Sequence, residues 1–226
     1  MKKTMAALAF LAVLAAGAFA QGISMSAGGG LFFDGSFNNG VKFKESPIES
    51  YGGIRNISFG GFVFFDAAYA EVNVSFAYGS ITAVDKFSIG SYSETNTEKM
   101  GSALQLGFSL LGKYPIELGP VTFFPLAGLG YNRVLSFKDT DGTKYDDAGD
   151  LSQFSILAGA GADYNLTDSL YLRGEILFQL RFASKTMKDM ADFVKAEIWN
   201  DYSIRVNPKT TLGLGPVIKV AVGYRL

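Results

Sequence analysis

The sequence of 226 residues has no cysteine and no histidine, and it has only one tryptophan and six prolines. Without cysteine the chain can form neither disulfides nor thiolate metal sites, so its stability must come from packing or from a closed backbone ladder. Without histidine it lacks the commonest general base for activating serine or water, and also the commonest transition-metal ligand. A carboxylate or lysine base remains a conceivable route to catalysis, but we expect no enzyme, no metal and no cofactor.

An excess of charge of one sign is also lacking, because 20 basic residues face 21 acidic ones. This balance provides no electrostatic footprint for a polyanion, so we expect no nucleic-acid partner. Long hydrophobic runs are absent after residue 20, although 48% of all residues are hydrophobic. The apolar content must therefore follow a shorter period than that of a transmembrane helix, and the abundance of phenylalanine (20) and tyrosine (11) favours strands.

Residues 1–20 have the pattern of a secretory signal peptide. A short basic start is followed by an apolar, uncharged run from Met5 to Gly17 and by the small residues Ala18 and Ala20. We predict cleavage before Gln21, which leaves residues 21–226 as a single domain with 18 basic and 21 acidic residues. An uncleaved membrane anchor is the alternative, but the run is shorter than the roughly 20 residues that a bilayer requires.

Five segments alternate between apolar and polar residues with the period of two that half-buried strands show. The clearest runs from Leu170 to Phe182, and the others cover residues 71–79, 103–110, 153–164 and 218–226. Three glycine-rich segments, residues 23–34, 57–66 and 121–135, alternate less cleanly. The sequence thus predicts eight strands, and the clear ones have the length of about 9–11 residues or more that a tilted membrane-crossing strand needs.

Short and long connections alternate along the chain. Residues 66–69, 114–120 and 165–169 are predicted tight turns, whereas residues 35–56, 81–101, 136–151 and 183–208 are predicted long, polar connections. Outer-membrane barrels have short periplasmic turns, longer outer loops and an even number of strands. Backbone groups in hydrocarbon cannot stay unpaired, so the sheet must close. We therefore predict an all-β fold, an eight-stranded antiparallel up-and-down transmembrane β-barrel in the outer membrane of a Gram-negative type of cell envelope, reached by Sec-type export.

Four tyrosines fall at the end of the barrel with the short turns. They are Tyr69, Tyr114, Tyr164 and Tyr224. Amphipathic rings at one depth are typical of a membrane-interface girdle, although tyrosine is also an ordinary strand residue.

The C-terminal residues resemble the signal by which the barrel-assembly machinery recognises its substrates. The positions of that signal, a polar, a small, an aromatic and a final hydrophobic residue, correspond to Lys219, Ala221, Tyr224 and Leu226. The usual last residue is aromatic, and here it is leucine. The resemblance implies the barrel-assembly machinery as a partner.

Two segments, Pro125 to Asn132 and Leu214 to Leu226, resemble the OmpW-like and OmpA-like small barrels. This resemblance implies one of two roles, a narrow, porin-like passage for small and often hydrophobic molecules, or a structural and adhesive barrel. The enzymes among membrane barrels depend on a histidine, which supports the expectation that this chain is not an enzyme.

Polar residues that alternate with the apolar face are predicted to line the lumen, because charges on the lipid face cost about 2–4 kcal/mol at the midplane. They are Glu71, Arg173, Glu175, Gln179, Arg181, Lys219 and Arg225. An eight-stranded barrel has little free interior. We expect these groups to plug the lumen as ion pairs, and the alternative is that Arg173 and Arg181 select anions or polar solutes on a conduction path.

Two of the long connections contain further candidates. Five aspartates crowd residues 139–150, but their spacing fails the EF-hand template, and we expect a solvated acidic loop. Apolar residues recur at helical spacing in the last connection, namely Met187, Met190, Ala191, Val194 and Ile198. They predict a short amphipathic helix, either as a cap on the barrel mouth or as a partner-binding or gating surface.

The sequence therefore predicts an integral outer-membrane barrel, with a narrow channel as the first function. The alternative is a structural or surface-adhesion barrel with a plugged lumen that acts through its extracellular loops. A soluble, lipocalin-like ligand-binding barrel is the second alternative, because alternation alone does not say which face points outward. The expected partners are outer-membrane lipids, the assembly machinery, and a small solute or host ligand at the loops.

Overall fold

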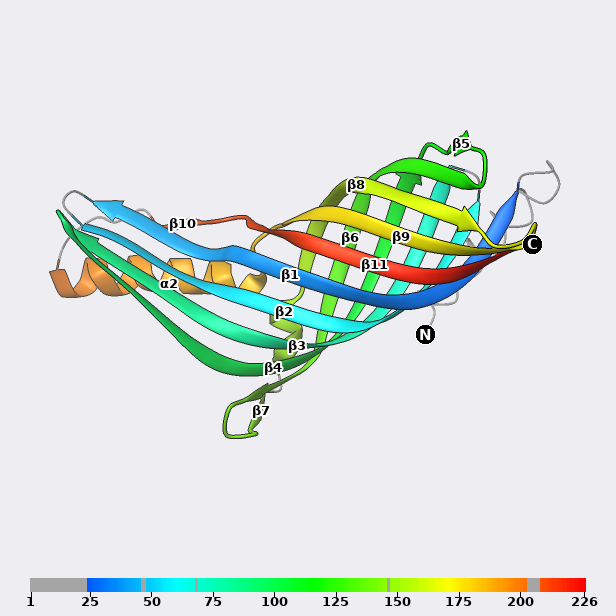
Figure 1. The fold of residues 1–226 in the computed structure, drawn as a ribbon. Helices are drawn as coiled ribbons and strands as arrows, with labels where there is room; N and C mark the ends of the chain where they lie inside the picture. Colours follow the sequence, from blue (N-terminus) through cyan, green and yellow to red (C-terminus); the bar gives the residue numbers. More distant parts are fainter. Residues whose placement is uncertain (1–23, 46–47, 68, 146, 203–207) are drawn as a thin grey trace.

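The computed structural model of the chain describes residues 24–45, 48–67, 69–145, 147–202 and 208–226. Eight long antiparallel strands form a closed ring in these residues (Figure 1). They are β1 (Met25–Glu45), β2 (Ile48–Ala67), β3 (Ala70–Ile89), β4 (Tyr92–Lys113), β6 (Val121–Asp139), β8 (Gln153–Asn165), β9 (Leu170–Arg181) and β11 (Gly213–Arg225). Each pairs with the next, and β1 pairs with β11 to close the ring. The predicted eight-stranded up-and-down barrel is confirmed, whereas the signal peptide and Ile23 lie outside the described residues.

The apolar face of the strands points away from the barrel interior. Phe59 is 58% exposed, Leu129 63% and Phe178 61%, while residues at alternating positions on the same strands are buried. Exposed leucine, valine and phenylalanine side chains on every wall of the ring suit hydrocarbon and not water. This direction of the faces contradicts the lipocalin-like alternative, which needs the apolar face inside.

The three short turns lie at one end of the barrel, as the sequence predicts. β2 ends at Ala67 and β3 begins at Ala70, and β8 ends at Asn165 before β9 begins at Leu170. The turn between β4 and β6 contains the short strand β5 (Ile116–Leu118), which pairs with the start of β6. The C-terminus lies at this same end (Figure 1).

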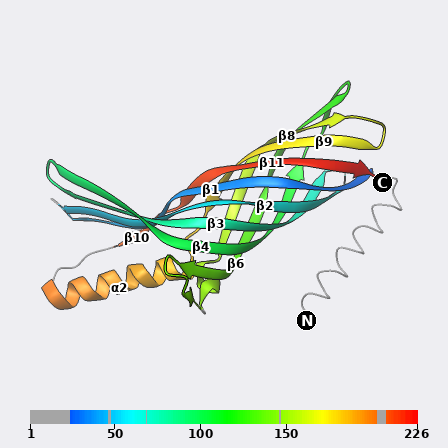
Figure 2. The same ribbon diagram turned by 60° about the horizontal axis from the view of Figure 1, so that its bottom comes forward.

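Two of the four long connections are not loops, and here the sequence-based prediction was wrong. Residues 35–45 and 48–56 continue β1 and β2 as one hairpin, and residues 81–89 and 92–101 continue β3 and β4 as another. Together these hairpins form a four-stranded sheet that projects beyond the barrel (Figures 1 and 2). We call this sheet the outer extension. The sequence does not indicate these strands, because both faces of the sheet carry polar residues and hydropathy does not alternate along them.

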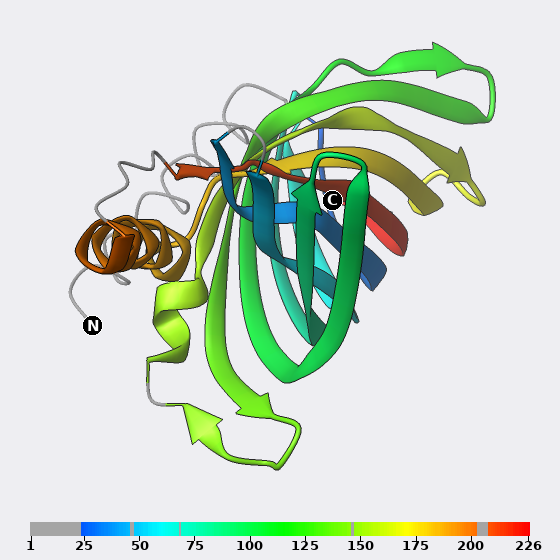
Figure 3. The ribbon, with the colours of Figure 1, turned by 90° about the vertical axis from the view of Figure 1, so that its left-hand side faces the viewer.

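Register shifts mark the place where the outer extension leaves the barrel. They fall between Ser36 and Asn39 in β1 and between Ile81 and Thr82 in β3. Bulges of this kind bend a sheet and increase its twist. Seen from the outer end, the two hairpins lie in front of the barrel, with the helical elements to one side (Figure 3).

The other two long connections carry the remaining elements. Residues 136–151 contain the end of β6, the short strand β7 (Lys144–Tyr145) and the 3-10 helix η1 (Ala148–Leu151). Residues 183–208 contain helix α2 (Lys185–Tyr202), followed by the short strand β10 (Lys209–Thr210), which pairs with β1.

The predicted helix in the last connection is confirmed, with one correction to its buried face. Met187 is 2% exposed and Ala191 is buried, but Met190 is 48% exposed. Met190 lies about 100° around the helix from Ala191 and therefore points away from the face on which Met187 and Ala191 pack. No helix among the described residues has the length and apolar character to cross a membrane.

Candidate functional site in the barrel interior

Strand alternation positions the charged residues of the interior. On β9, residues Tyr171, Arg173, Glu175, Leu177, Gln179 and Arg181 are all buried and their neighbours point outward. Glu71 on β3 and Lys219 on β11 are buried on the same inner side. Six of the seven residues predicted to line the lumen thus lie inside the barrel.

The seventh, Arg225, lies half-buried at the mouth with the short turns. Its guanidinium donates hydrogen bonds to the side chain of Asn165 (2.5 Å) and to the carbonyl oxygen of Asp168 (3.2 Å). These bonds join the end of β11 to the turn between β8 and β9. Arg225 therefore lies on the inner side of the rim, where it lines the vestibule at this mouth and its Cζ atom is 5.1 Å from the ring centre of Tyr171.

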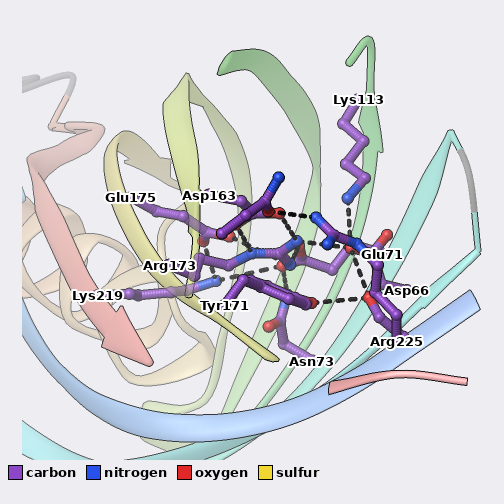
Figure 4. A network of polar contacts seen from close by, with 12 residues as sticks. Asp66, Glu71, Asn73, Lys113, Asp163, Tyr171, Arg173, Glu175, Lys219 and Arg225 are labelled. Carbon is purple, nitrogen blue, oxygen red and sulfur yellow. Dashed lines mark hydrogen bonds and ion pairs between the residues drawn. The ribbon is translucent and has the colours of Figure 1, made fainter. Parts of the chain in front are cut away.

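Arg173 is the centre of an ion network in the half of the barrel near the short turns (Figure 4). Its Nε and Nη2 donate to the two carboxylate oxygens of Asp163, at 2.7 and 2.8 Å. Nη1 donates to Glu71 at 2.6 Å, and Nη2 also donates to Asp66 at 2.7 Å. Three carboxylates from three different strands therefore hold one guanidinium that is 3% exposed.

Two lysines extend the network across the lumen. Lys219 forms ion pairs with Glu175 at 3.0 Å and with Glu71 at 3.9 Å, and Lys113 pairs with Asp66. The group thus contains four carboxylates, of Asp66, Glu71, Asp163 and Glu175, and three cations, of Lys113, Arg173 and Lys219. Near-balance of charge is needed, because an unpaired charge away from water is very costly.

Aromatic rings pack against the same guanidinium. The Cζ atom of Arg173 lies 4.4 Å from the ring centre of Phe64, 5.0 Å from that of Phe124 and 5.3 Å from that of Tyr171. Rings at these distances attract a cation through their quadrupole, and they also fill the space around it. The Tyr171 hydroxyl bonds to the Ser26 hydroxyl at 2.7 Å, so its polar end is satisfied too.

The network includes residues that the sequence did not single out. Asp66 lies in a predicted turn, Lys113 lies directly before one, and Asp163 alternates with the apolar residues of its strand. The signal that could find them is the register, because Asp66 pairs with Glu71 and Asp163 with Arg173. Residues on one row of paired positions share a face and a depth.

Large apolar side chains also lie inside the barrel, beside the charged residues. The buried apolar cluster contains Phe32, Phe62, Phe64, Leu111, Phe124, Leu126, Leu157, Tyr171, Leu177 and Val217. Glycines opposite these rings leave the room they need. A Cβ at Gly161 would overlap the Phe124 ring, and a Cβ at Gly223 would overlap the Tyr171 ring.

A second, smaller polar group lies nearer the outer end. Arg181 pairs with Asp34 and donates to the Gln179 side chain at 3.1 Å, and Gln179 donates to Ser155 at 2.7 Å. A cavity of about 60 Å³ lies between this group and the Arg173 network, lined by Asp34, Ser58, Asn73, Gln105, Gln179 and Lys219 among others. Apolar side chains, among them Phe32, Phe62 and Leu157, line the same cavity, and its volume is sufficient for a few water molecules beside the polar groups.

The two mouths of the barrel differ. At the short-turn end, a vestibule of about 230 Å³ leads to Asp66, Lys113 and Asp163 of the network. At the outer end, Ile81, Ala103, Val134 and Phe137 form an apolar cluster with Ala148 of η1. The vestibule therefore ends at charged side chains, and the outer mouth is partly covered by η1.

The predicted interface and assembly residues lie on the outside, except for two. Tyr69, Tyr114, Tyr164 and Tyr224 are all exposed near the short turns, and the rings of Tyr69 and Tyr114 stack at 6.4 Å. Of the remaining C-terminal signal residues, Leu226 is exposed, whereas Lys219 and Ala221 are buried in the lumen. Their roles at the interface and in assembly stay predictions.

The acidic connection between β6 and β8 folds around its own first aspartate. The Asp139 side chain accepts hydrogen bonds from the backbone N–H groups of Asp141 (3.0 Å) and Thr143 (2.9 Å). Asp146 lies outside the described residues, and among the described ones no acidic cluster has the arrangement of a metal site. Asp139 therefore acts as a turn-stabilising residue.

Comparisons with known proteins bear on the whole chain. A family described as "Outer membrane protein beta-barrel domain" matches residues 6–225. The structure is similar to that of the outer membrane protein OprG from Pseudomonas aeruginosa, with 12% identity, a TM-score of 0.44, and coverage of 90% of this chain and 95% of that chain. It is less similar to the translocator domain of the autotransporter NalP from Neisseria meningitidis, with 12% identity, a TM-score of 0.28 and coverage of 99% and 98%. No curated protein gave a significant match.

Proposed function

The chain belongs to the outer-membrane β-barrel domain family and is an integral outer-membrane protein, and on this premise we propose that its lumen is closed and that it acts through its outer extension. The role is structural or adhesive and not enzymatic. The observation that carries the proposal is the Arg173 network, which joins opposite walls of the barrel inside the lumen (Figure 4).

The network closes the lumen because its contacts cross it. Arg173 on β9 reaches Asp66 on β2 and Glu71 on β3, which lie on the other side of the ring from β8 and β9. Phe64, Phe124 and Tyr171 fill the space around the guanidinium. A solute would have to separate these pairs, and breaking one buried ion pair costs about 3–5 kcal/mol.

The outer extension provides the exposed surface for an external role. Its four strands carry exposed charged and aromatic side chains, including Lys86, Phe87, Tyr92 and Glu94. A sheet whose backbone hydrogen bonds are made within the two hairpins can hold such side chains in fixed positions outside the membrane. This property suits recognition better than transport.

A narrow passage for small solutes, hydrophobic ones among them, is the second candidate function. It is favoured by the vestibule of about 230 Å³ on one side of the network and the cavity of about 60 Å³ on the other. The Arg173 network and the rings packed around it separate these two spaces. The resemblance to OmpW-like barrels also favours this candidate.

Planar-bilayer recordings distinguish the two functions. We expect no steady current from wild-type protein whose heat-modifiable gel mobility shows that it is folded. The triple variant Glu71→Ser, Asp163→Ser, Arg173→Ser removes the centre of the network together with two of its three carboxylate partners, and we expect it to conduct. The matched control removes the exposed ion pair of Asp150 and Lys185, which lies outside the lumen, and should stay silent.

Steady current through folded wild-type protein would contradict the closed lumen. If the ion selectivity of that current also changed in an Arg173→Gln variant, the result would support the narrow passage as the function of the barrel.

A further inference from the structure

The two faces of the outer extension carry opposite charges. In an antiparallel sheet, paired residues point to the same side. By this rule one face, which we call the basic face, carries Lys42, Lys44, Arg55, Lys86, Lys99 and Lys209, with Glu49 as the only carboxylate among the paired residues that the structure describes. The opposite face carries Asp85, Glu94 and Glu98 and, within the same described pairs, no lysine or arginine.

The cations of the basic face form rows across the sheet. One row runs from Lys209 on β10 through Lys42 on β1 and Tyr51 on β2 to Lys86 on β3. Another joins Arg55, Thr82 and Lys99. The rows therefore collect cations from five strands that are far apart in the sequence, together with hydroxyl groups such as that of Thr82.

The basic face is continuous with the lipid-facing surface of the barrel. On β2 the outward residues Phe59 and Ile57 are exposed apolar side chains, and the next outward residue is Arg55. β2 and β3 pair without a register shift, so residues that point outward in the barrel continue onto the basic face along both strands. At about 3.3 Å per residue, Arg55 lies roughly 7 Å beyond Ile57 along the strand. The first cations thus follow directly on the apolar band, where the headgroups of the outer leaflet lie.

Most of this positive charge is not compensated within the protein. Glu49 pairs with both Lys42 and Lys44. Lys86 and Arg55 instead lie over aromatic rings, at 5.9 Å from Tyr51 and 5.3 Å from Phe37. Lys99 and Lys209 are exposed, and neither pairs with a carboxylate of the described residues.

We propose that the basic face binds the phosphate groups of outer-leaflet lipid headgroups. Each lysine or arginine near an anionic membrane surface strengthens binding by about fivefold. Phosphate oxygens also accept the hydrogen bonds that lysine, arginine and hydroxyl groups donate. The inference goes beyond the proposed function and does not depend on whether the lumen conducts. Its basis is that the rows of cations begin at the edge of the apolar band, with Arg55 and Lys99, and that the opposite face carries no cation within the described pairs.

The test compares two triple variants that each remove three charges from the same sheet. Lys86→Gln, Lys99→Gln, Lys209→Gln acts on the basic face. Asp85→Asn, Glu94→Gln, Glu98→Gln acts on the opposite face, with two of its positions directly beside the first set. Full-length protein folded in a zwitterionic detergent is titrated with a bisphosphorylated lipid A and with the same lipid after removal of both phosphates. Binding is followed by native mass spectrometry, and heat-modifiable gel mobility verifies folding.

We expect the wild type to bind the phosphorylated lipid at least about tenfold more tightly than the dephosphorylated one, with an affinity that falls as salt is added. The basic-face variant should lose between about tenfold and a hundredfold, from about fivefold for each cation at the surface. The acidic-face variant should bind as well as the wild type or better.

Equal affinity for the two lipids would overturn the proposal, as would an equal loss in both variants. Competition by an anionic polysaccharide or by inorganic phosphate at concentrations similar to those of the lipid would overturn the assignment to lipid headgroups.

Discussion

At the scale of single residues, Arg173 shows how a charge is accommodated inside a membrane barrel. Its guanidinium provides donors in a fixed fork, and here Nε, Nη1 and Nη2 all contact carboxylates in different directions. Lysine offers a single point charge and cannot contact Asp66, Glu71 and Asp163 in the same way. The role of Arg173 therefore depends on the shape of its side chain as well as on its charge.

Replacing Arg173 by methionine should strongly destabilise the barrel. The change leaves buried carboxylates without their partner, which costs about 3–5 kcal/mol. Urea unfolding of protein refolded in lipid vesicles measures the loss. The control Lys185→Met breaks the exposed pair with Asp150 and should leave the urea midpoint unchanged. Similar midpoints for the wild type and Arg173→Met would contradict the central role of the network.

Two glycines test the packing of the interior. Gly161 faces the Phe124 ring and has no room for a Cβ, whereas a Cβ at Gly174 would have no heavy atom within 4 Å. Gly161→Val should therefore lower the stability by about 1–3 kcal/mol through overpacking. Gly174→Val adds an apolar group on the lipid side of β9 and should be neutral or stabilising. The same unfolding measurement ranks the two variants, and the reverse order would refute the packing described for the lumen.

At the scale of elements, the β1–β2 hairpin of the outer extension is held by ion pairs as well as by the hydrogen bonds between its strands. At the end of the β1–β2 hairpin, hydrogen bonds donated by Lys42 and Lys44 lower the pKa of the Glu49 carboxyl from its ordinary 4.5. A carboxyl whose pKa is lower in the folded chain than in the unfolded chain stabilises the hairpin at pH values above its unfolded-state pKa. This stabilisation is lost as the pH falls through its folded-state pKa. The tip of the hairpin should therefore loosen only in acid.

Carbon-detected NMR of the labelled Glu49 carboxyl in detergent micelles measures this titration. We expect its midpoint below 4.5 in the wild type and close to 4.5 in the Lys42→Gln, Lys44→Gln variant. A Lys99→Gln variant removes a cation from the same face without contacting Glu49 and should leave the midpoint where it is. An unchanged midpoint in the double variant would show that the two ion pairs do not form.

At the scale of the whole molecule, the closure of the ring decides whether the chain can exist in a bilayer. β1 pairs with β2 on one side and with β11 on the other, so no membrane-level strand has an open edge. In hydrocarbon an unpaired backbone group costs several kcal/mol. The first and last strands of the ring therefore stabilise each other although they are almost the full chain apart.

Removal of residues 213–226 should abolish folding, because it leaves the facing edges of β1 and β9 without a partner. Refolding into lipid vesicles does not need the assembly machinery, so it separates this effect from the loss of the C-terminal signal. The control replaces residues 186–201 of α2 by a flexible Gly-Ser linker, which opens no strand edge. We expect heat-modifiable gel mobility for the control and none for the truncated chain. Folding of the truncated chain would show that closure is dispensable.

The sequence by itself determined the ring, through the alternation of residues and of short and long connections, and the charges on one face of each strand indicated the side to which that face points. Leu172, Ile176 and Phe178 alternate with Arg173, Glu175 and Gln179, and only one arrangement places the charges away from lipid. Three short turns and the even number of strands followed from the same pattern. The polar residues on β3, β9 and β11 could be assigned to the interior for this reason, since hydropathy and strand period are local properties.

The tertiary structure alone decided the depth and the partners of those residues, because register is a relation between strands. The sequence does not say that Asp66 and Asp163 meet Arg173, or that Phe64 and Phe124 fill the lumen beside it. It also does not mark the outer extension as strands, because both faces of that sheet are polar and backbone pairing leaves no trace in hydropathy. The separation of positive and negative charges onto its two faces likewise depends on which residues pair across the strands.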